Sequence, residues 1–429
     1  MEEKNNKLIK LFNYLNKNNY YFSELLPDNI SKNNIEEIYN NLPIIYKKNI
    51  LDNTPIYFDK SFSKLFKSTE ELYNTLFDMN KVDKNYSREL IFDNQKWNVE
   101  YTTGTTGKPF PIVKNSLEVI LASSYLLKCR KRIYNNANLK NGFLLAHEID
   151  PVLKSSEFFR ENYNFNSIID YYIKTAPSWM FVTANTVKRF TKSIIKNERE
   201  QDIIKIPLKF IEVTGAKLNP EYKNKIEHIF NTKTYSQYGC RELWNIAYEC
   251  ECGNLHINDK DLIVDITNED GQIITESGEE GEVIITSLNN RITPFIKYYL
   301  GDYAKIKHTK CSCGNCSPII ELTGKRKANK LKNTEYFGDD IFRRVLRAIY
   351  IGCKITYDKI RIIQDKDYHI TVYVSGCNNF SFFKERFIAI SNEIIDGFTN
   401  FSVSFSEHYN FDIRQDFLKE TTFISIVNN

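Results

Sequence analysis

The chain has 429 residues, of which 42% are hydrophobic and 14% aromatic, a composition typical of globular rather than disordered proteins. Its net charge is only +4, and its 58 basic and 54 acidic side chains are interspersed, which argues against a nucleic-acid partner or a membrane-surface role. No run approaches the roughly 20 apolar residues of a membrane span, and no segment of signal-peptide type follows Met1, so we expect a cytoplasmic protein. A chain of this length predicts two or three domains.

The first part of the chain leads into a loop rich in glycine and threonine. Residues 1 to about 95 predict helices, and residues 96–101 predict a strand. The octet Thr102-Thr103-Gly104-Thr105-Thr106-Gly107-Lys108-Pro109 follows directly. Its glycines allow close approach of the backbone to a polyanion, and its N–H groups, hydroxyls and lysine suit phosphate. The Gly-x-x-Gly-Lys pattern alone could equally be an ordinary turn, since its spacing is not that of a Walker A loop; the whole octet favours the phosphate interpretation.

Beyond the octet, predicted helices and strands alternate. Helices are expected at 116–137 and 184–197 and from Pro220, with strands at 143–146, 167–171, 208–213 and 233–239. This alternation predicts a layered α/β domain around a mixed or parallel sheet. Ligands of such sheets bind at the carboxyl ends of the strands. The strands that end at Gly104, Gly215 and Gly239 are therefore expected to share one crevice.

The last third of the chain predicts two further regions. Residues 262–266 and 281–286 are β-rich and flank a turn at 268–271, which indicates a small β region. A lysine-rich stretch begins at Lys325, and about a hundred residues of mixed helix and strand follow. We therefore predict a large domain at 1–323, a hinge linker at 324–332 and a small C-terminal α+β domain at 333–429.

Five of the nine cysteines fall between residues 250 and 316. There are two similar knuckles, Cys250-Glu251-Cys252-Gly253 and Cys311-Ser312-Cys313-Gly314. His256 is close to the first in sequence, and Cys316 follows the second. Thiolates and an imidazole in a reducing compartment predict a closed, structural zinc site. Four of these six candidate ligands suffice, and the spacing cannot choose among them. Cys240 has no histidine near it in sequence and is interpreted as a packing residue.

Several motifs occur in an order that is typical of one family. They are the segment 101–109, Thr214-Gly215-Ala216-Lys217-Leu218, Gln237-Tyr238-Gly239-Cys240-Arg241-Glu242, Gly278-Glu279-Glu280-Gly281-Glu282-Val283 and the segment 294–302 with its Gly301-Asp302. Together they resemble the AMP-forming, adenylate-forming ligase superfamily. The likeness is strongest to its phenylacetate–CoA ligase-like branch, which includes capsule-biosynthesis-associated relatives. The resemblance covers nearly the whole chain and implies a large N-terminal αβ domain and a small mobile C-terminal domain.

The resemblance also implies an activity and a set of site residues. ATP would activate an aryl or acyl carboxylic acid to acyl-AMP with release of pyrophosphate, and the acyl group would pass to coenzyme A or to the phosphopantetheine of an acyl carrier protein. Lys108, Glu242 and Lys419 would act in catalysis, with Glu242 binding Mg²⁺. The nucleotide would contact Thr102, Thr103, Gly104, Thr105, Thr106, Gly107, Lys108, Gly215, Ala216, Gln237, Tyr238, Gly239, Asp302 and Lys325. The implied zinc ligands are Cys250, His256, Cys311 and Cys313, with Cys252 and Cys316 as alternates.

The sequence departs from the family pattern at some of these positions. Lys217 replaces the usual glutamate, Arg241 a threonine, and Lys297 and Tyr299 replace arginines. The tail carries Lys419 without the glycine that precedes the catalytic lysine in the family. Two alternatives therefore stay open: a non-catalytic nucleotide- or acyl-binding relative, and an enzyme that passes the acyl group to an amine or sugar. The sequence does not identify the acid, and it leaves a homodimer open.

Overall fold

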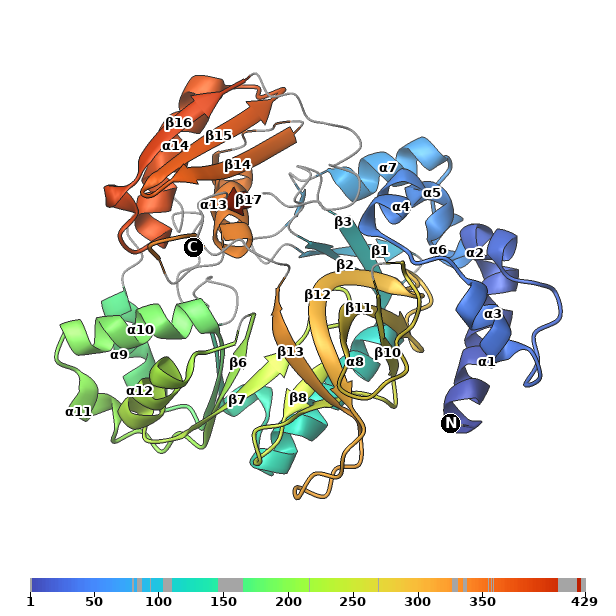
Figure 1. The fold of residues 1–429 in the computed structure, drawn as a ribbon, viewed down its shortest axis with the longest axis horizontal. Coiled ribbons are helices and arrows are strands. Elements are labelled where there is room, and N and C mark those ends of the chain that lie inside the picture. The colour runs from blue at the N-terminus through green and yellow to red at the C-terminus, as the bar shows by residue number, and fades with distance from the viewer. Residues whose placement is uncertain are drawn as a thin grey trace. The chain divides into compact units, whose positions relative to one another are not determined.

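The computed structural model describes residues 2–78, 81–82, 87–92, 94–102, 110–145, 165–215, 217–268, 270–325, 331–334, 338–353, 355, 357, 359–407 and 423–425. The chain forms two compact units (Figure 1). The first comprises the described residues within Met1–Glu100, Pro111–Phe158 and Asn162–Gly324. The second comprises those within Tyr101–Phe110 and Lys325–Asn429. Within the part of the chain described here, no helix is both long enough and apolar enough to cross a membrane.

The N-terminal region is helical up to residue 77, as predicted. The apolar residues of the first helix recur every three or four positions, so Leu8, Leu11, Phe12 and Leu15 share one buried face. Seven helices occur there: α1 (Glu2–Asn18), α2 (Tyr20–Leu25), α3 (Ile35–Asn41), α4 (Lys47–Asp52), α5 (Thr54–Tyr57), α6 (Lys60–Ser63) and α7 (Thr69–Phe77).

Two strands of a three-stranded sheet flank the glycine-rich octet in sequence, one before it and one after it. Its order is β1-β2-β3, formed by β1 (Ser87–Phe92), β2 (Gln95–Thr102) and β3 (Phe110–Asn115). The predicted strand at 96–101 is confirmed, but the expectation of helix up to residue 95 is wrong for β1. Asn94 has a positive φ of 61°, which suits the tight turn that pairs Phe92 with Gln95.

A ten-stranded mixed sheet runs through the first unit in the order β10-β11-β12-β13-β9-β8-β7-β6-β5-β4. Strands β4 to β7 are parallel, and the pairs β7–β8, β8–β9, β9–β13, β10–β11 and β11–β12 are antiparallel. The predicted β-rich region therefore continues the α/β sheet. The strands are β4 (Gly142–Leu145), β5 (Trp179–Thr183), β6 (Phe210–Thr214), β7 (Lys233–Tyr238), β8 (Ala247–Glu249), β9 (Leu255–Ile257), β10 (Leu262–Thr267), β11 (Glu280–Ser287), β12 (Tyr298–Lys307) and β13 (Ile319–Lys325).

The helices of this unit alternate with the parallel strands. They are α8 (Ser116–Ile133), the 3₁₀ helix η2 (Leu139–Asn141), α9 (Phe165–Thr175), α10 (Ala184–Lys196), α11 (Glu200–Ile203) and α12 (Pro220–Phe230). The strand predicted at 167–171 is wrong, because these residues belong to α9. Ile168, Ile169 and Tyr172 are buried at helical spacing and pack into the core formed with α10 and α12. Pro220 does begin α12, capped by the Asn219 side chain as expected.

The second unit has a four-stranded sheet in the order β16-β15-β14-β17. Its helices α13 and α14 bury Phe342 and Phe387 against this sheet. Leu331 belongs to the same core. The Gln364 side chain accepts a hydrogen bond from the Lys332 N–H at 2.8 Å and donates one to the Lys332 carbonyl at 3.3 Å. The chain is therefore anchored to this unit by residue 331. The elements are α13 (Gly338–Cys353), β14 (Lys359–Lys366), β15 (His369–Ser375), α14 (Phe380–Ile394), the 3₁₀ helix η4 (Phe398–Asn400), β16 (Ser402–Ser406) and β17 (Phe423–Ser425), the last not predicted.

Candidate nucleotide site and cysteine cluster

Two of the predicted glycine-terminated strands are neighbours in the sheet. Strands β6 and β7 are parallel, with Thr214 opposite Gln237, so both end at the same edge. Gly215 follows β6 with φ of +84°, a conformation that favours glycine. A Cβ atom on Gly239, which follows β7, would lie 2.0 Å from the Trp244 carbonyl oxygen. Glycine is therefore required at Gly239 by the close approach of the next turn.

That turn carries Glu242 and is fixed by hydrogen bonds to the end of β7. The Ile246 N–H donates to the Tyr238 carbonyl at 2.8 Å, and the Gln237 side chain donates to the Trp244 carbonyl. Trp244 has a positive φ of 61°, which is unusual for a bulky residue. The backbone around Glu242 therefore has one defined conformation, supported from the strand it follows.

Two motifs that are distant in sequence meet through Tyr238 and Asp302. The Tyr238 hydroxyl donates to Asp302 Oδ2 at 2.9 Å, which joins the end of β7 to β12. Burial, and then the charge of Asp302, raise the pKa of Tyr238 well above its ordinary value. The phenol therefore stays protonated as a donor, and Asp302 remains an acceptor with a defined orientation.

Glu242 is a buried carboxylate whose hydrogen-bond donor is a neutral phenol. It is only 8% exposed, and Oε1 accepts a hydrogen bond from the Tyr298 hydroxyl at 2.9 Å. The Cys240 thiol also faces it, and burial followed by the Glu242 charge raises the pKa of this thiol. Among the residues that the structure describes, no lysine or arginine forms an ion pair with Glu242. Because an uncompensated buried charge is costly, a bound cation fits this position.

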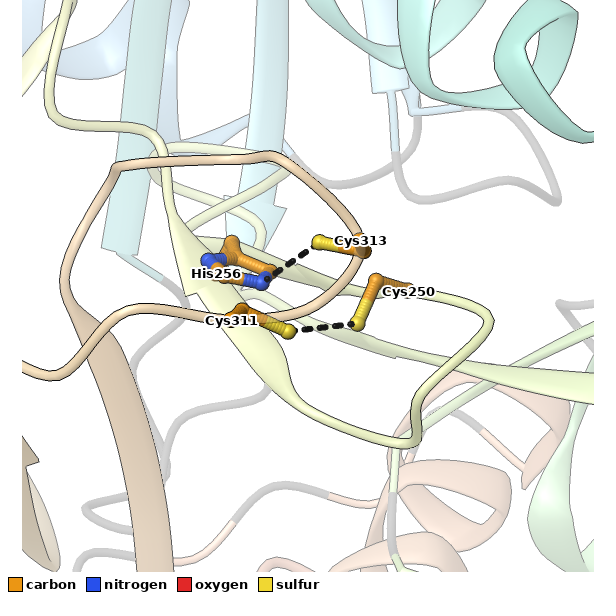
Figure 2. Close-up of side chains that lie close together, drawn as sticks. All are labelled: Cys250, His256, Cys311 and Cys313. Carbon is orange, nitrogen blue, oxygen red and sulfur yellow. Dashed lines mark hydrogen bonds between the residues drawn. The ribbon is translucent and has the colours of Figure 1, made fainter.

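The four cysteine and histidine side chains implied by the resemblance come together (Figure 2). The ligand atoms of Cys250, His256, Cys311 and Cys313 all lie within 4.8 Å of one another. Cys313 Sγ is 3.3 Å from His256 Nε2, and the Cys250 and Cys311 sulfurs are 3.8 Å apart. The Ser317 carbonyl lies 2.9 Å from His256 Nδ1 and can only accept, so Nδ1 carries the proton and Nε2 offers its lone pair.

Two thiols of the cluster, those of Cys311 and Cys250, have pKa values shifted in opposite directions. A hydrogen bond from the Cys313 backbone lowers the pKa of Cys311 to about 5, whereas burial raises the pKa of Cys250 to about 12. Cys252 and Cys316 are exposed and lie outside the four. Three sulfurs and one imidazole nitrogen form the donor set of a closed tetrahedral zinc site. The residues present therefore fit zinc.

Comparisons with known proteins bear on this arrangement. No protein family model matches the chain. Protein CapK of Staphylococcus aureus is 22% identical over 325 residues, which cover 72% of this chain and 63% of CapK. The chain thus spans less than two thirds of that relative's length.

Solved structures show a more extensive similarity. A 2-hydroxyisobutyryl-CoA ligase in complex with 2-HIB-AMP and CoA, in the thioesterification state, matches with a TM-score of 0.62 at 12% identity, covering 99% of this chain and 89% of that one. An open conformation of the same ligase matches with a TM-score of 0.57 at 12% identity, covering 98% and 90%. The chain has the adenylate-forming ligase fold. The resemblance inferred from the motifs is confirmed at the level of the fold.

Within this fold, Lys297 and Tyr299 have partners away from the Tyr238–Asp302 pair. Lys297 Nζ donates to the carbonyl oxygens of Asn40 and Leu42 at 3.0 and 2.7 Å, so it anchors the segment after α3. The Tyr299 hydroxyl donates to Glu282 at 3.0 Å. The contacts of Lys297 therefore give it a structural role here.

Replacing Lys297 with methionine is expected to lower the free energy of unfolding by about 2–4 kcal/mol, because the buried Leu42 carbonyl and the more exposed Asn40 carbonyl both lose their donor. Urea unfolding of the variant measures this difference. Lys297→Arg serves as the control, because a guanidinium retains donors for both carbonyls. Equal stability of the methionine variant and the wild type would contradict the structural role.

Several predicted site residues lie outside the described residues: Thr103, Gly104, Thr105, Thr106, Gly107, Lys108, Ala216 and Lys419. The backbones of Thr102 and Lys325 are described as the ends of β2 and β13. The sequence interpretation missed Glu100, Lys114 and Trp244, which form a buried polar network beside Glu242. The signal available was a glutamate and a lysine in the two strands on either side of the octet.

Proposed function

We propose that this chain activates a carboxylic acid with ATP and transfers the acyl group to a thiol. A carboxylate oxygen attacks the α-phosphorus of ATP, the bond from that phosphorus to the bridging oxygen breaks, and pyrophosphate leaves. The thiolate then attacks the acyl carbon of acyl-AMP, and AMP leaves. The proposal rests chiefly on one observation: within the adenylate-forming fold, the Tyr238–Asp302 contact brings two nucleotide motifs together beside Glu242.

We assign each part of the nucleotide to different residues. We assign the ribose hydroxyls to Asp302, which is oriented by the hydrogen bond from Tyr238 to its Oδ2 atom. Tyr238 would also flank the adenine base. Glu242 would hold Mg²⁺, which prefers carboxylate and phosphate oxygens. When bound, the ion neutralises charge on the phosphates as pyrophosphate departs. Lys108 and Lys419 keep their predicted roles at the phosphates and the acyl group, as part of the same proposal.

The cysteine cluster would hold zinc through Cys250, His256, Cys311 and Cys313. With four protein ligands, such a site is closed and supplies stability rather than a reactive position. It would tie the turn after β8 to the loop between β12 and β13. The knuckles also support placing the chain in the phenylacetate–CoA ligase-like branch.

The test is ATP–pyrophosphate exchange with Mg²⁺ across a panel of aryl, fatty and small hydroxy acids, followed by addition of coenzyme A. Acid-dependent exchange and thioester formation with coenzyme A are the expected results. Exchange without a coenzyme A thioester would direct the search to a phosphopantetheine carrier, an amine or a sugar. ATP binding in calorimetry without any exchange would instead support the non-catalytic alternative.

A further inference from the structure

A buried ion pair links the two strands on either side of the glycine-rich octet. Glu100 lies on β2, two residues before Thr102, and Lys114 lies on β3, five residues after Pro109. Lys114 Nζ is 2.5 Å from Glu100 Oε2, with the two side chains 1% and 16% exposed. Burying both charges is costly, and the pair is favourable only when further hydrogen bonds complete it.

Those additional bonds come from the turn that carries Glu242. The Trp244 indole N–H donates to Glu100 Oε2 at 2.8 Å, and Lys114 Nζ donates to the Arg241 carbonyl at 3.2 Å. The ammonium also lies 5.2 Å from the Trp244 ring, within cation–π range. Burial alone would raise the pKa of Glu100, but the charge of Lys114 and the hydrogen bonds from Lys114 and Trp244 lower it overall, so Glu100 is ionised at neutral pH.

The atoms contacted are next to Glu242 in the chain. The Arg241 carbonyl forms the peptide bond into Glu242, and Trp244 is two residues beyond it with its positive φ. The turn is far along the chain from these two neighbouring strands, and the ion pair with its two hydrogen bonds joins all three. We propose that Glu100 and Lys114 are positioning residues, which fix Glu242 relative to the strands that end at the phosphate loop.

This inference rests on the proposed ATP binding and predicts a specific defect. The variant Glu100→Gln/Lys114→Met removes both charges together, so neither is left buried alone. It is expected to raise KM for MgATP at least tenfold and to lower kcat, while KM for the acid and the zinc content stay unchanged. Loss of general stability alone would lower the melting temperature without changing KM for MgATP of the folded protein.

The matched control is Glu89→Gln/Lys96→Met, the same charge change in an exposed ion pair between β1 and β2. It is expected to keep wild-type KM values. If the Glu100/Lys114 variant does not fold, Trp244→Phe decides the matter, since it removes only the indole donor and is expected to weaken MgATP binding about threefold or more. Wild-type MgATP affinity in a folded double variant, or in Trp244→Phe, would overturn this inference but leave the proposed function intact. Absence of MgATP binding by the wild type would overturn the proposed function itself.

Discussion

Replacing Glu242 with glutamine is expected to reduce ATP–pyrophosphate exchange by about 10²–10³-fold, the usual effect of losing one charge-stabilising group at a reacting centre. Glutamine keeps the shape of the side chain, and its carbonyl still accepts from the Tyr298 hydroxyl. It has no negative charge for Mg²⁺. We therefore expect a much weaker Mg²⁺ dependence, measured by titrating the exchange reaction with the metal.

The same substitution separates a catalytic role from a structural one. Because the hydrogen-bond donor to the buried Glu242 is a neutral hydroxyl, and no described lysine or arginine forms an ion pair with it, removing the charge should leave the free energy of unfolding unchanged or raise it. A structural carboxylate would show the opposite sign. Glu282→Gln is the matched control, since Glu282 also accepts from tyrosine hydroxyls, those of Tyr299 and Tyr303. Full exchange activity in the Glu242 variant would exclude it as the magnesium ligand.

Local patterns in the sequence predicted much of the α/β core. Gly215 and Gly239 each follow the end of a strand. Gly215 has a positive φ and Gly239 lies against the Trp244 carbonyl, and both are backbone constraints that favour glycine. The Asn219-Pro220 pair likewise defines the start of α12 through local capping chemistry. Such features depend on a few neighbouring residues and can be recognised without tertiary context.

The errors occur where tertiary contacts decide the outcome. Residues 167–171 are rich in isoleucine and tyrosine and suit a strand, yet packing against α10 and α12 makes them part of α9. Strand β1 was missed because β2 provides its hydrogen-bond partners. Lys297 was recognised only as a lysine in place of the family's arginine, and its acceptors belong to residues more than 250 positions away. Sequence spacing contains no information about such long-range partners.

The cysteine and histidine cluster depends on local patterns and on tertiary contacts alike. The two knuckles were recognisable from sequence, but six candidates remained, and only the folded chain separates Cys250, Cys311 and Cys313 from the exposed Cys252 and Cys316. Replacing Cys311 with serine is expected to abolish stoichiometric zinc, measured by elemental analysis. It should also destabilise the protein by about 4 kcal/mol where free zinc exceeds its dissociation constant a thousandfold. The melting temperature should fall by on the order of 10 °C.

The exposed cysteines provide the internal controls for this prediction. Cys252→Ser and Cys316→Ser should both retain one zinc per chain and the wild-type melting temperature, because neither sulfur belongs to the four-residue cluster. A chelator should reproduce the Cys311→Ser effect in the wild type and add nothing in the variant, since the metal has already been lost. If Cys316→Ser lost zinc while Cys311→Ser kept it, the ligand set would be different. Zinc-free wild-type protein with full stability would show instead that the cluster holds no structural metal.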